Sequence, residues 1–152
     1  MNQGRHNLSL RTRFSFVLTA LFACLLAALG GLWLQGARNG IHEEVEAATR
    51  VTEQWLGVLA RQAGNAGAID VDALLALLQP AGRIRANALE VLDAAGQRLY
   101  LSPPPTYKRG RVVPAAFAAL LAPEFAARPV KFGALTVVIH PDPSRSLIDA
   151  WD

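Results

Sequence analysis

The stretch "NALEVLDAAGQRLYLSPPP", residues 87–105, decides the fold of the second half of the chain. A turn sequence, DAAG at 93–96, separates two short runs with apolar residues at alternate positions, 89–91 and 99–101. This pattern predicts two short strands joined as a hairpin. Because helical patterns precede and follow the hairpin, we expect an α+β fold with an antiparallel sheet.

The segments on either side of the hairpin predict three short helices and one further strand. We expect helices at residues 70–80, 114–123 and from 143 onward, and a strand at about 130–140. Proline at the first helical position or just beyond the last one supports these bounds. The folded unit should therefore be small, with short helices around an antiparallel sheet.

A long apolar segment, Phe14–Leu34, contains no charged side chain. As a helix it would be about 32 Å long, and the hydrocarbon core of a bilayer is about 30 Å thick. Arg5, Arg11 and Arg13 precede it, whereas "RNGIHEEVE" at 38–46 follows it. The positive-inside rule therefore predicts a cytoplasmic basic tail at 1–13, a transmembrane helix at 14–34 and an exported remainder.

Two processing alternatives remain for this segment. A signal peptidase could cleave after Ala28-Leu29-Gly30, although this small-x-small site lies inside the apolar run. "LFAC", ending at Cys24, resembles a lipoprotein acylation site, although Phe22 is bulky and the residues after Cys24 stay apolar. We expect an uncleaved anchor, in which Cys24 is a small lipid-compatible residue.

Charge and composition restrict the partners of the chain. The formal net charge is +3, but acidic and basic side chains balance from residue 35 onward, so we expect no nucleic-acid partner. Most basic residues are arginine and alanine is abundant, which is associated with GC-rich bacterial genomes. We therefore expect the bacterial inner membrane as the location, and membrane lipid as one partner.

Two helical surfaces predict a homodimer. Ala23, Ala27 and Gly31 form a small-xxx-small face in the apolar segment, which would let two membrane helices approach closely. The helix should continue beyond the membrane to about Ala63, with a heptad seam at alternating spacings of four and three. The seam residues are Ile41, Val45, Ala48, Thr52, Trp55, Leu59 and Gln62. Alternatively, this helix lies on its own domain's sheet.

The basic residues around the hairpin suggest one binding site. Arg83 and Arg85 precede the hairpin, and Lys108, Arg109 and Arg111 follow it, so the five could together hold an anion. A solvated loop is the alternative. The sequence contains no set of residues typical of nucleophilic catalysis, a phosphate loop or a zinc site, and we expect no cofactor, no metal and no catalytic residue.

Three stretches together resemble a known family. They are "SLRTRFSFVLTALFACLLAAL" at 9–29, the hairpin ending in "LYLSPP", and "VVIHPDPSRSLIDAWD" at 137–152. They resemble the amino-terminal region of bacterial two-component sensor histidine kinases, in particular those with the periplasmic domain named after LapD and MoxY. The resemblance implies a dimeric receptor whose cytoplasmic kinase modules act on a response regulator.

The resemblance implies a domain organisation and a function. Residues 35–143 would be a PAS-like periplasmic sensor domain, and residues 144–152 would begin a helix leading to a second membrane span, before which this chain is truncated. Ligand or partner binding would then be relayed across the membrane. The alternatives are a single-span, membrane-tethered binding or scaffold protein and the sensor region of a cyclic-dinucleotide signalling protein.

The last helix should contact the first. Leu147, Ile148 and Trp151 form an apolar face on a helix too short to be stable alone. We expect this face to be buried against the long helix near Ile41 and Val45.

Overall fold

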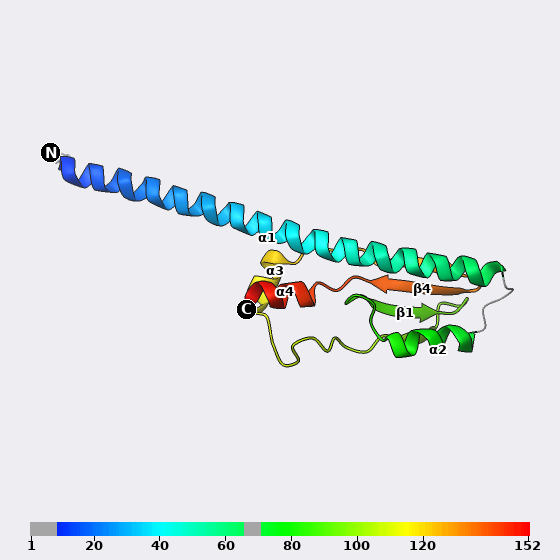
Figure 1. The fold of residues 1–152 in the computed structure, drawn as a ribbon. Coiled ribbons are helices and arrows are strands. Elements are labelled where there is room, and N and C mark those ends of the chain that lie inside the picture. Colours follow the sequence, from blue (N-terminus) through cyan, green and yellow to red (C-terminus); the bar gives the residue numbers. More distant parts are fainter. Residues whose placement is uncertain (1–8, 66–70) are drawn as a thin grey trace, which may run out of the picture. The chain divides into compact units, whose positions relative to one another are not determined.

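The computed structural model describes residues 9–65 and 71–152 (Figure 1). The chain divides into two compact units, Met1–Gly36 and Ala37–Asp152, which share one continuous helix, α1 (Leu10–Asn65). Helix α1 begins after Ser9, whose Oγ accepts a hydrogen bond of 3.3 Å from the Thr12 N–H as an N-cap residue does. The two units are described separately below.

The first unit is the apolar part of α1. Its large side chains are exposed, including Phe16 and Leu32, and the most apolar window of the helix has a mean hydropathy of 2.3 with none of it buried. A fully exposed apolar helix is unfavourable in water and favourable in lipid. By length and composition this helix could therefore cross a membrane, which is consistent with the predicted anchor.

The second unit contains a four-stranded antiparallel sheet with the strand order β2-β1-β4-β3. The predicted hairpin is confirmed as β1 (Ala88–Leu92) and β2 (Arg98–Leu101). The single strand expected at 130–140 is wrong, because the structure has a second hairpin, β3 (Arg128–Phe132) and β4 (Leu135–His140). Gly133, with φ of 61°, makes the tight turn between them. The sequence does not indicate this turn, because apolar residues lie on both sides of the glycine.

The short helices of the second unit occur where the sequence places them. They are α2 (Val71–Ala81), α3 (Ala115–Leu121) and α4 (Ser144–Trp151). At the start of α4 the Asp142 carboxylate accepts a hydrogen bond of 2.9 Å from the Ser144 N–H. The predicted fold class, α+β with a long amino-terminal helix followed by an antiparallel sheet and short helices, is confirmed.

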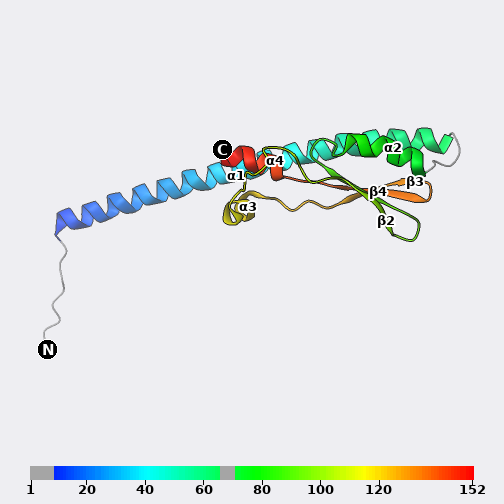
Figure 2. The same ribbon diagram turned by 90° about the horizontal axis from the view of Figure 1, so that it is seen from below.

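The hydrophobic core lies on one face of the sheet. The paired residues Leu89 and Ile139 point to this face, together with the pair Val91 and Val137, and all four are fully buried. Both α1 and α2 contribute to the same core, with Leu56 from α1 and Leu74 and Leu78 from α2. Figure 2 shows these two helices on the same side of the strands. The unit therefore has two layers, and the opposite face, with Thr136 and Val138, is partly exposed.

The face of α1 that the heptad pattern assigned to a dimer packs within its own chain. Ile41 and Val45 are 5% exposed and Thr52 is fully buried, whereas Trp55 is 38% exposed. Ala48, Leu59 and Gln62 are not buried. The alternative of a helix on its own domain therefore describes residues 41–60, since Leu56 is in the core and Leu59 and Ala60 pack against it. The amphipathic spacing of a heptad serves a sheet as well as a second helix.

The contacts of α4 agree only in part with expectation. Leu147 and Ile148 are buried, as expected. Trp151 is 48% exposed, so it is not buried as expected. Its ring instead meets Phe117 of α3 edge to face, with 4.9 Å between ring centroids. The sequence could not indicate this, because the approach of α3 depends on the long loop that precedes it.

Candidate functional site

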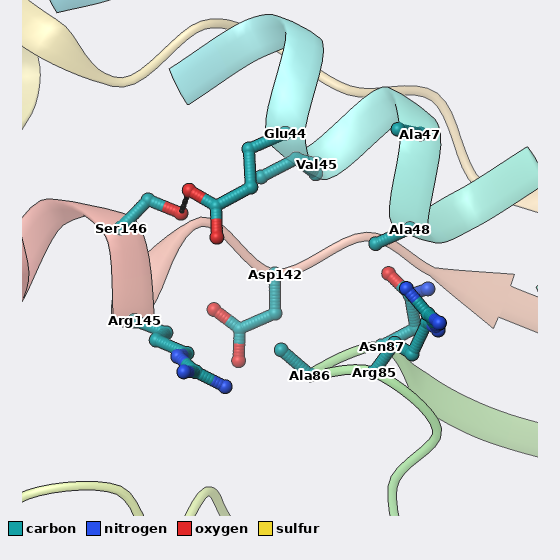
Figure 3. Close-up of a pocket in the computed structure, with 10 residues that line it drawn as sticks. All are labelled: Glu44, Val45, Ala47, Ala48, Arg85, Ala86, Asn87, Asp142, Arg145 and Ser146. Atoms are coloured by element: carbon teal, nitrogen blue, oxygen red, sulfur yellow. Dashed lines mark hydrogen bonds between the residues drawn. The ribbon is translucent and has the colours of Figure 1, made fainter. Parts of the chain in front are cut away.

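A cavity of about 470 Å³ lies between α1, the turn before β1 and the beginning of α4 (Figure 3). All of it belongs to the second unit. Its lining residues are Glu44, Val45, Ala47 and Ala48 from α1, Arg85, Ala86 and Asn87 from the turn, and Asp142, Arg145 and Ser146 from the start of α4. Its size is in the range of small-molecule sites, and it is lined by charged groups of both signs.

The turn that forms one wall has an unusual backbone. Ile84 and Asn87 exchange both of their backbone hydrogen bonds, of 3.2 and 2.9 Å, so the two residues between them make a two-residue turn. Those residues, Arg85 and Ala86, have φ of 49° and 74°. This is the geometry of a type I′ turn, which normally contains Asn-Gly, and a non-glycine residue in this region costs about 1 kcal/mol.

Arg83 holds the turn against the start of α4. Its Nε and Nη2 donate hydrogen bonds of 3.1 and 2.7 Å to the Ala86 carbonyl, and Nη2 also donates to the Asp142 carboxylate. The Arg83 and Asp142 side chains are 15% and 21% exposed. Because both partners are largely shielded from water, this ion pair is stronger than a surface pair and fixes the position of the turn.

Asn87 fixes the other end of the turn to α1. It is almost completely buried, and its Nδ2 donates a hydrogen bond of 3.0 Å to Thr52 Oγ1. Thr49 Oγ1 donates a weaker bond of 3.3 Å to Asn87 Oδ1, and both threonine hydroxyls also donate to carbonyls of α1. A buried amide requires such partners, so this network specifies the approach of the turn to α1.

Helices α1 and α4 meet at one side of the cavity. Ser146 Oγ donates a hydrogen bond of 2.9 Å to Glu44 Oε2, which Figure 3 shows across the space between the two helices. Two residues before Glu44 on α1, the His42 ring stacks on Phe125 with 5.5 Å between centroids. The cavity is thus closed on this side by a single polar contact between helices.

A second cavity, of about 290 Å³, adjoins the first and shares Ala86, Asp142 and Arg145 with it. Tyr107 also lines it, and Arg145 lies over the Tyr107 ring at 4.8 Å from the centroid. The Tyr107 hydroxyl donates a hydrogen bond of 2.6 Å to Asp149. This bond to a carboxylate raises the pKa of Tyr107 and lowers the pKa of Asp149.

The loop before α3 is tied to α4 by ion pairs. Lys108 Nζ lies 3.0 Å from Asp149 and 2.7 Å from Asp152, and Arg111 lies 3.2 Å from Asp152. The hydrogen bonds to Asp152 and Asp149 raise the pKa of Lys108, and the bond from Lys108 lowers the pKa of Asp152. These basic groups are therefore neutralised by carboxylates of the same chain.

The five basic residues that suggested an anion site do not come together. Arg85 lines the larger cavity and Arg83 the smaller one, whereas Lys108 and Arg111 pair with α4. Arg109 is exposed and makes no ion pair within the part of the chain that the structure describes. The structure therefore does not gather the five residues in one cavity: Arg83, Lys108 and Arg111 pair with carboxylates of the same chain, whereas Arg85 and Arg109 do not pair with any described residue.

Three lining residues were not found from the sequence: Glu44, Asp142 and Arg145. Glu44 occurs in a run of acidic residues that matches no binding motif, and Asp142 stands where a helix cap is common. No local spacing connects residues from positions 44 and 145. Only the packing of α4 beside α1 brings them together.

Comparison of the chain with protein-family models, with curated proteins and with solved structures finds no match. The cavity is therefore interpreted from its own geometry.

Proposed function

We propose that the chain is the membrane-anchored sensor region of a bacterial receptor. In this proposal residues 1–13 are cytoplasmic, residues 14–34 cross the inner membrane, and the second unit is a PAS-like periplasmic domain that binds a ligand in the cavity beside Asn87. The observation that carries the proposal is that the cavity is lined by both α1 and α4. A ligand there would contact the helix that continues from the apolar segment and the helix that ends the domain.

The proposed transmission step is a change in the relative position of these two helices. Only the Ser146 to Glu44 hydrogen bond links α1 to α4 among the contacts at the cavity, and one such bond contributes about 1–3 kcal/mol. A ligand that binds one arrangement of the helices better can shift their equilibrium by its difference in affinity. We further propose that α4 leads to a second membrane span and that a histidine kinase responds to the shift.

Homodimerisation is part of the proposal, on a surface of α1 that shares only Trp55 with the predicted seam. Val51, Trp55 and Val58 form an exposed apolar stripe on α1, at 43%, 38% and 44% exposure. Their heptad positions are those of the small residues Ala23 and Ala27 four heptads earlier. If two α1 helices form a left-handed coiled coil, the small residues Ala23 and Ala27 and the exposed stripe would therefore both face the second copy.

The experiment is a binding screen on the full chain in lipid nanodiscs. Sugars, organic acids, amino acids, polyamines and nucleotides are tested one class at a time by thermal unfolding. Ala47→Trp fills the cavity from an exposed helix position, and Gln62→Trp is the control at an exposed position of α1. We expect one class of compound to raise the Tm of the wild type and of Gln62→Trp, but not that of Ala47→Trp. If no class raises the Tm, or if Ala47→Trp responds like the wild type, the cavity is not a sensor site.

The same preparation tests the transmission step. Nitroxide labels at Arg50→Cys and Ala150→Cys, both exposed, report the distance between α1 and α4 in a Cys24→Ser background. The compound found in the screen should change the distance distribution, and it should not do so when Ala47→Trp is present. An unchanged distribution with bound compound would show that binding is not coupled to these helices.

A further inference from the structure

The charges that line the cavity are not balanced within the protein. Asp142 is already occupied, since it pairs with Arg83 and accepts hydrogen bonds from Ser144. Glu44 accepts only the Ser146 hydrogen bond and has no cationic partner in the described residues. A carboxylate that lines a cavity without a cation is a site for a positively charged group.

On the other walls, two guanidinium groups lack a close carboxylate. The Arg85 side chain makes no hydrogen bond or ion pair with any residue that the structure describes. Arg145 approaches Asp149 only to 4.0 Å and is 58% exposed. Figure 3 shows Glu44 and the two arginines on different sides of the same cavity.

The backbone at Arg85 supports a role for its side chain. A type I′ turn with Asn-Gly would make the same connection without strain, yet this chain has arginine and alanine there, both with positive φ. The turn is kept in place by Arg83 and Asn87, which do not need the Arg85 guanidinium. Strain at a cavity wall that serves no structural contact suggests that the side chain serves a ligand.

We propose that the cavity binds a free α-amino acid, an inference that rests on the proposed sensor function. The ligand carboxylate would lie against Arg85 and Arg145, and its ammonium group would replace the missing cation beside Glu44. The ligand side chain would lie against the apolar part of the wall, formed by Val45, Ala47 and Ala48. A ligand of one charge satisfies only half of this site, because an anion leaves Glu44 without a cation, and a cation leaves Arg85 without a carboxylate and Arg145 with only its 4.0 Å approach to Asp149.

The test compares ligands with the same carbon skeleton on the full chain in nanodiscs. An amino acid that raises the Tm in a screen of the twenty common amino acids is measured by calorimetry beside its decarboxylated amine and its deaminated acid. We expect both analogues to bind about tenfold or more weakly, because each forms only one of the two sets of charge-assisted hydrogen bonds that the amino acid forms. Equal affinity for the amino acid and either analogue would overturn the proposal.

Two variants separate the two halves of the site. Arg85→Asn keeps a residue that tolerates the left-handed backbone, and should lose about tenfold in amino-acid affinity together with the preference over the amine. Glu44→Gln should lose the preference over the deaminated acid. The matched controls are Arg109→Gln and Glu43→Gln, which remove the same charges from exposed residues outside the cavity and should bind as the wild type does.

The outcomes distinguish the ligand class from the sensor function. One outcome is that no amino acid binds, while another class of compound raises the Tm of the wild type but not that of Ala47→Trp. In that case the amino-acid assignment is wrong and the sensor proposal stands. If amino acids bind equally well to Arg85→Asn, Glu44→Gln and the controls, they bind elsewhere and the assignment is also wrong. Circular dichroism of each variant shows that loss of binding is not loss of fold.

Discussion

Ser146 in the first turn of α4 donates a 2.9 Å hydrogen bond to the Glu44 carboxylate on α1, although 102 residues separate them. This bond connects the helix that follows the apolar segment with the last helix of the domain. The next two residues of α4, Leu147 and Ile148, are buried and apolar. The hydrogen bond is therefore the contact most sensitive to a charged ligand in the adjacent cavity.

Removal of the Ser146 hydroxyl should loosen α4 without unfolding the domain. In Ser146→Ala we expect amide hydrogen exchange of residues 147–151 to increase about tenfold, since a hydrogen bond to a charged acceptor contributes about 1.5 kcal/mol. Glu44→Gln should have a smaller effect, and the double variant should be no more mobile than Ser146→Ala. Additive effects of the two changes would show that the residues are not coupled.

The buried Asn87 network should contribute strongly to stability. Thr52→Val removes the acceptor of the Asn87 amide without changing side-chain size, and should lower the free energy of unfolding by about 1–3 kcal/mol. Thr49→Val should cost less, because Thr49 contacts Asn87 only at 3.3 Å. Thr136→Val, on the partly exposed sheet face, is the control. Urea unfolding of the full chain measures all three, and similar losses at Thr49 and Thr52 would contradict the proposed roles.

The contact between β3 and α1 should depend on pH. Arg128 lies 3.0 Å from Glu53 and also pairs with Glu46, and these bonds raise the pKa of Arg128. The bond from Arg128 lowers the pKa of Glu46 below its usual 4.5. A lowered pKa in the folded state means that the pair stabilises the fold above pH 4.5 and ceases to do so as the pH falls through the lowered value.

The corresponding experiment is a pH series on Arg128→Gln. Above pH 4.5 the wild type should be modestly more stable than the variant, because the groups are partly exposed to solvent. The difference should shrink as Glu46 is protonated at lower pH. Arg109→Gln, which removes an exposed guanidinium without a partner among the described residues, should match the wild type at every pH. A difference for Arg128→Gln that stays constant down to strongly acidic pH would exclude the Glu46 pair as its cause.

Crosslinking should distinguish the exposed α1 stripe from the buried seam. In a Cys24→Ser background, cysteines at Val51 or Val58 should crosslink two copies readily in membranes, because these positions are exposed. Cysteine at Val45 should crosslink poorly, because this residue is buried within its own chain. Cysteine in place of Glu46, which lies outside the exposed stripe, is the control and should also crosslink poorly. Efficient crosslinking at Val45 would mean that α1 leaves its own sheet in the dimer.

The orientation of the anchor can be tested by fusing alkaline phosphatase after Asp152. We expect active enzyme in the membrane fraction, since the arginines precede the uncharged segment. Replacement of Arg11 and Arg13 by glutamate should lower the activity, because it removes the charge difference that directs export. Activity in the soluble periplasm would instead indicate cleavage, and an inactive fusion would place the domain in the cytoplasm.

Much of the fold could be predicted because its signals are local. The turn sequence at 93–96 lies between apolar runs, prolines precede α3 and α4, and the uncharged segment 14–34 is longer than a soluble core helix requires. The strand at 130–140 was predicted incorrectly because apolar residues flank Gly133 closely on both sides. There the φ of one residue, rather than hydrophobicity, divides the segment into two strands.

The candidate site could be predicted only in fragments. Arg83 and Arg85 were recognised as basic, but they were expected to share one site with Lys108, Arg109 and Arg111, which follow the hairpin. In the structure Arg83 pairs with Asp142, and Arg85 faces a cavity beside Arg145. The sequence shows which side chains are basic, but whether a guanidinium meets a carboxylate, as Arg83 does, or faces a cavity, as Arg85 does, depends on the packing.

The sequence by itself determined which segments are helical or extended, which face of each is apolar, and that one segment is apolar enough for a membrane, because these properties depend on neighbours within a few residues. The tertiary structure decided which apolar faces of the helices and the sheet pack against each other. A heptad spacing on α1 fits a second helix or a sheet equally well, and the choice of the sheet depends on Leu56 joining the core of Leu89 and Ile139. The same packing brings Glu44 and Ser146 into contact, because it sets α4 beside α1, and no local pattern records such a distance.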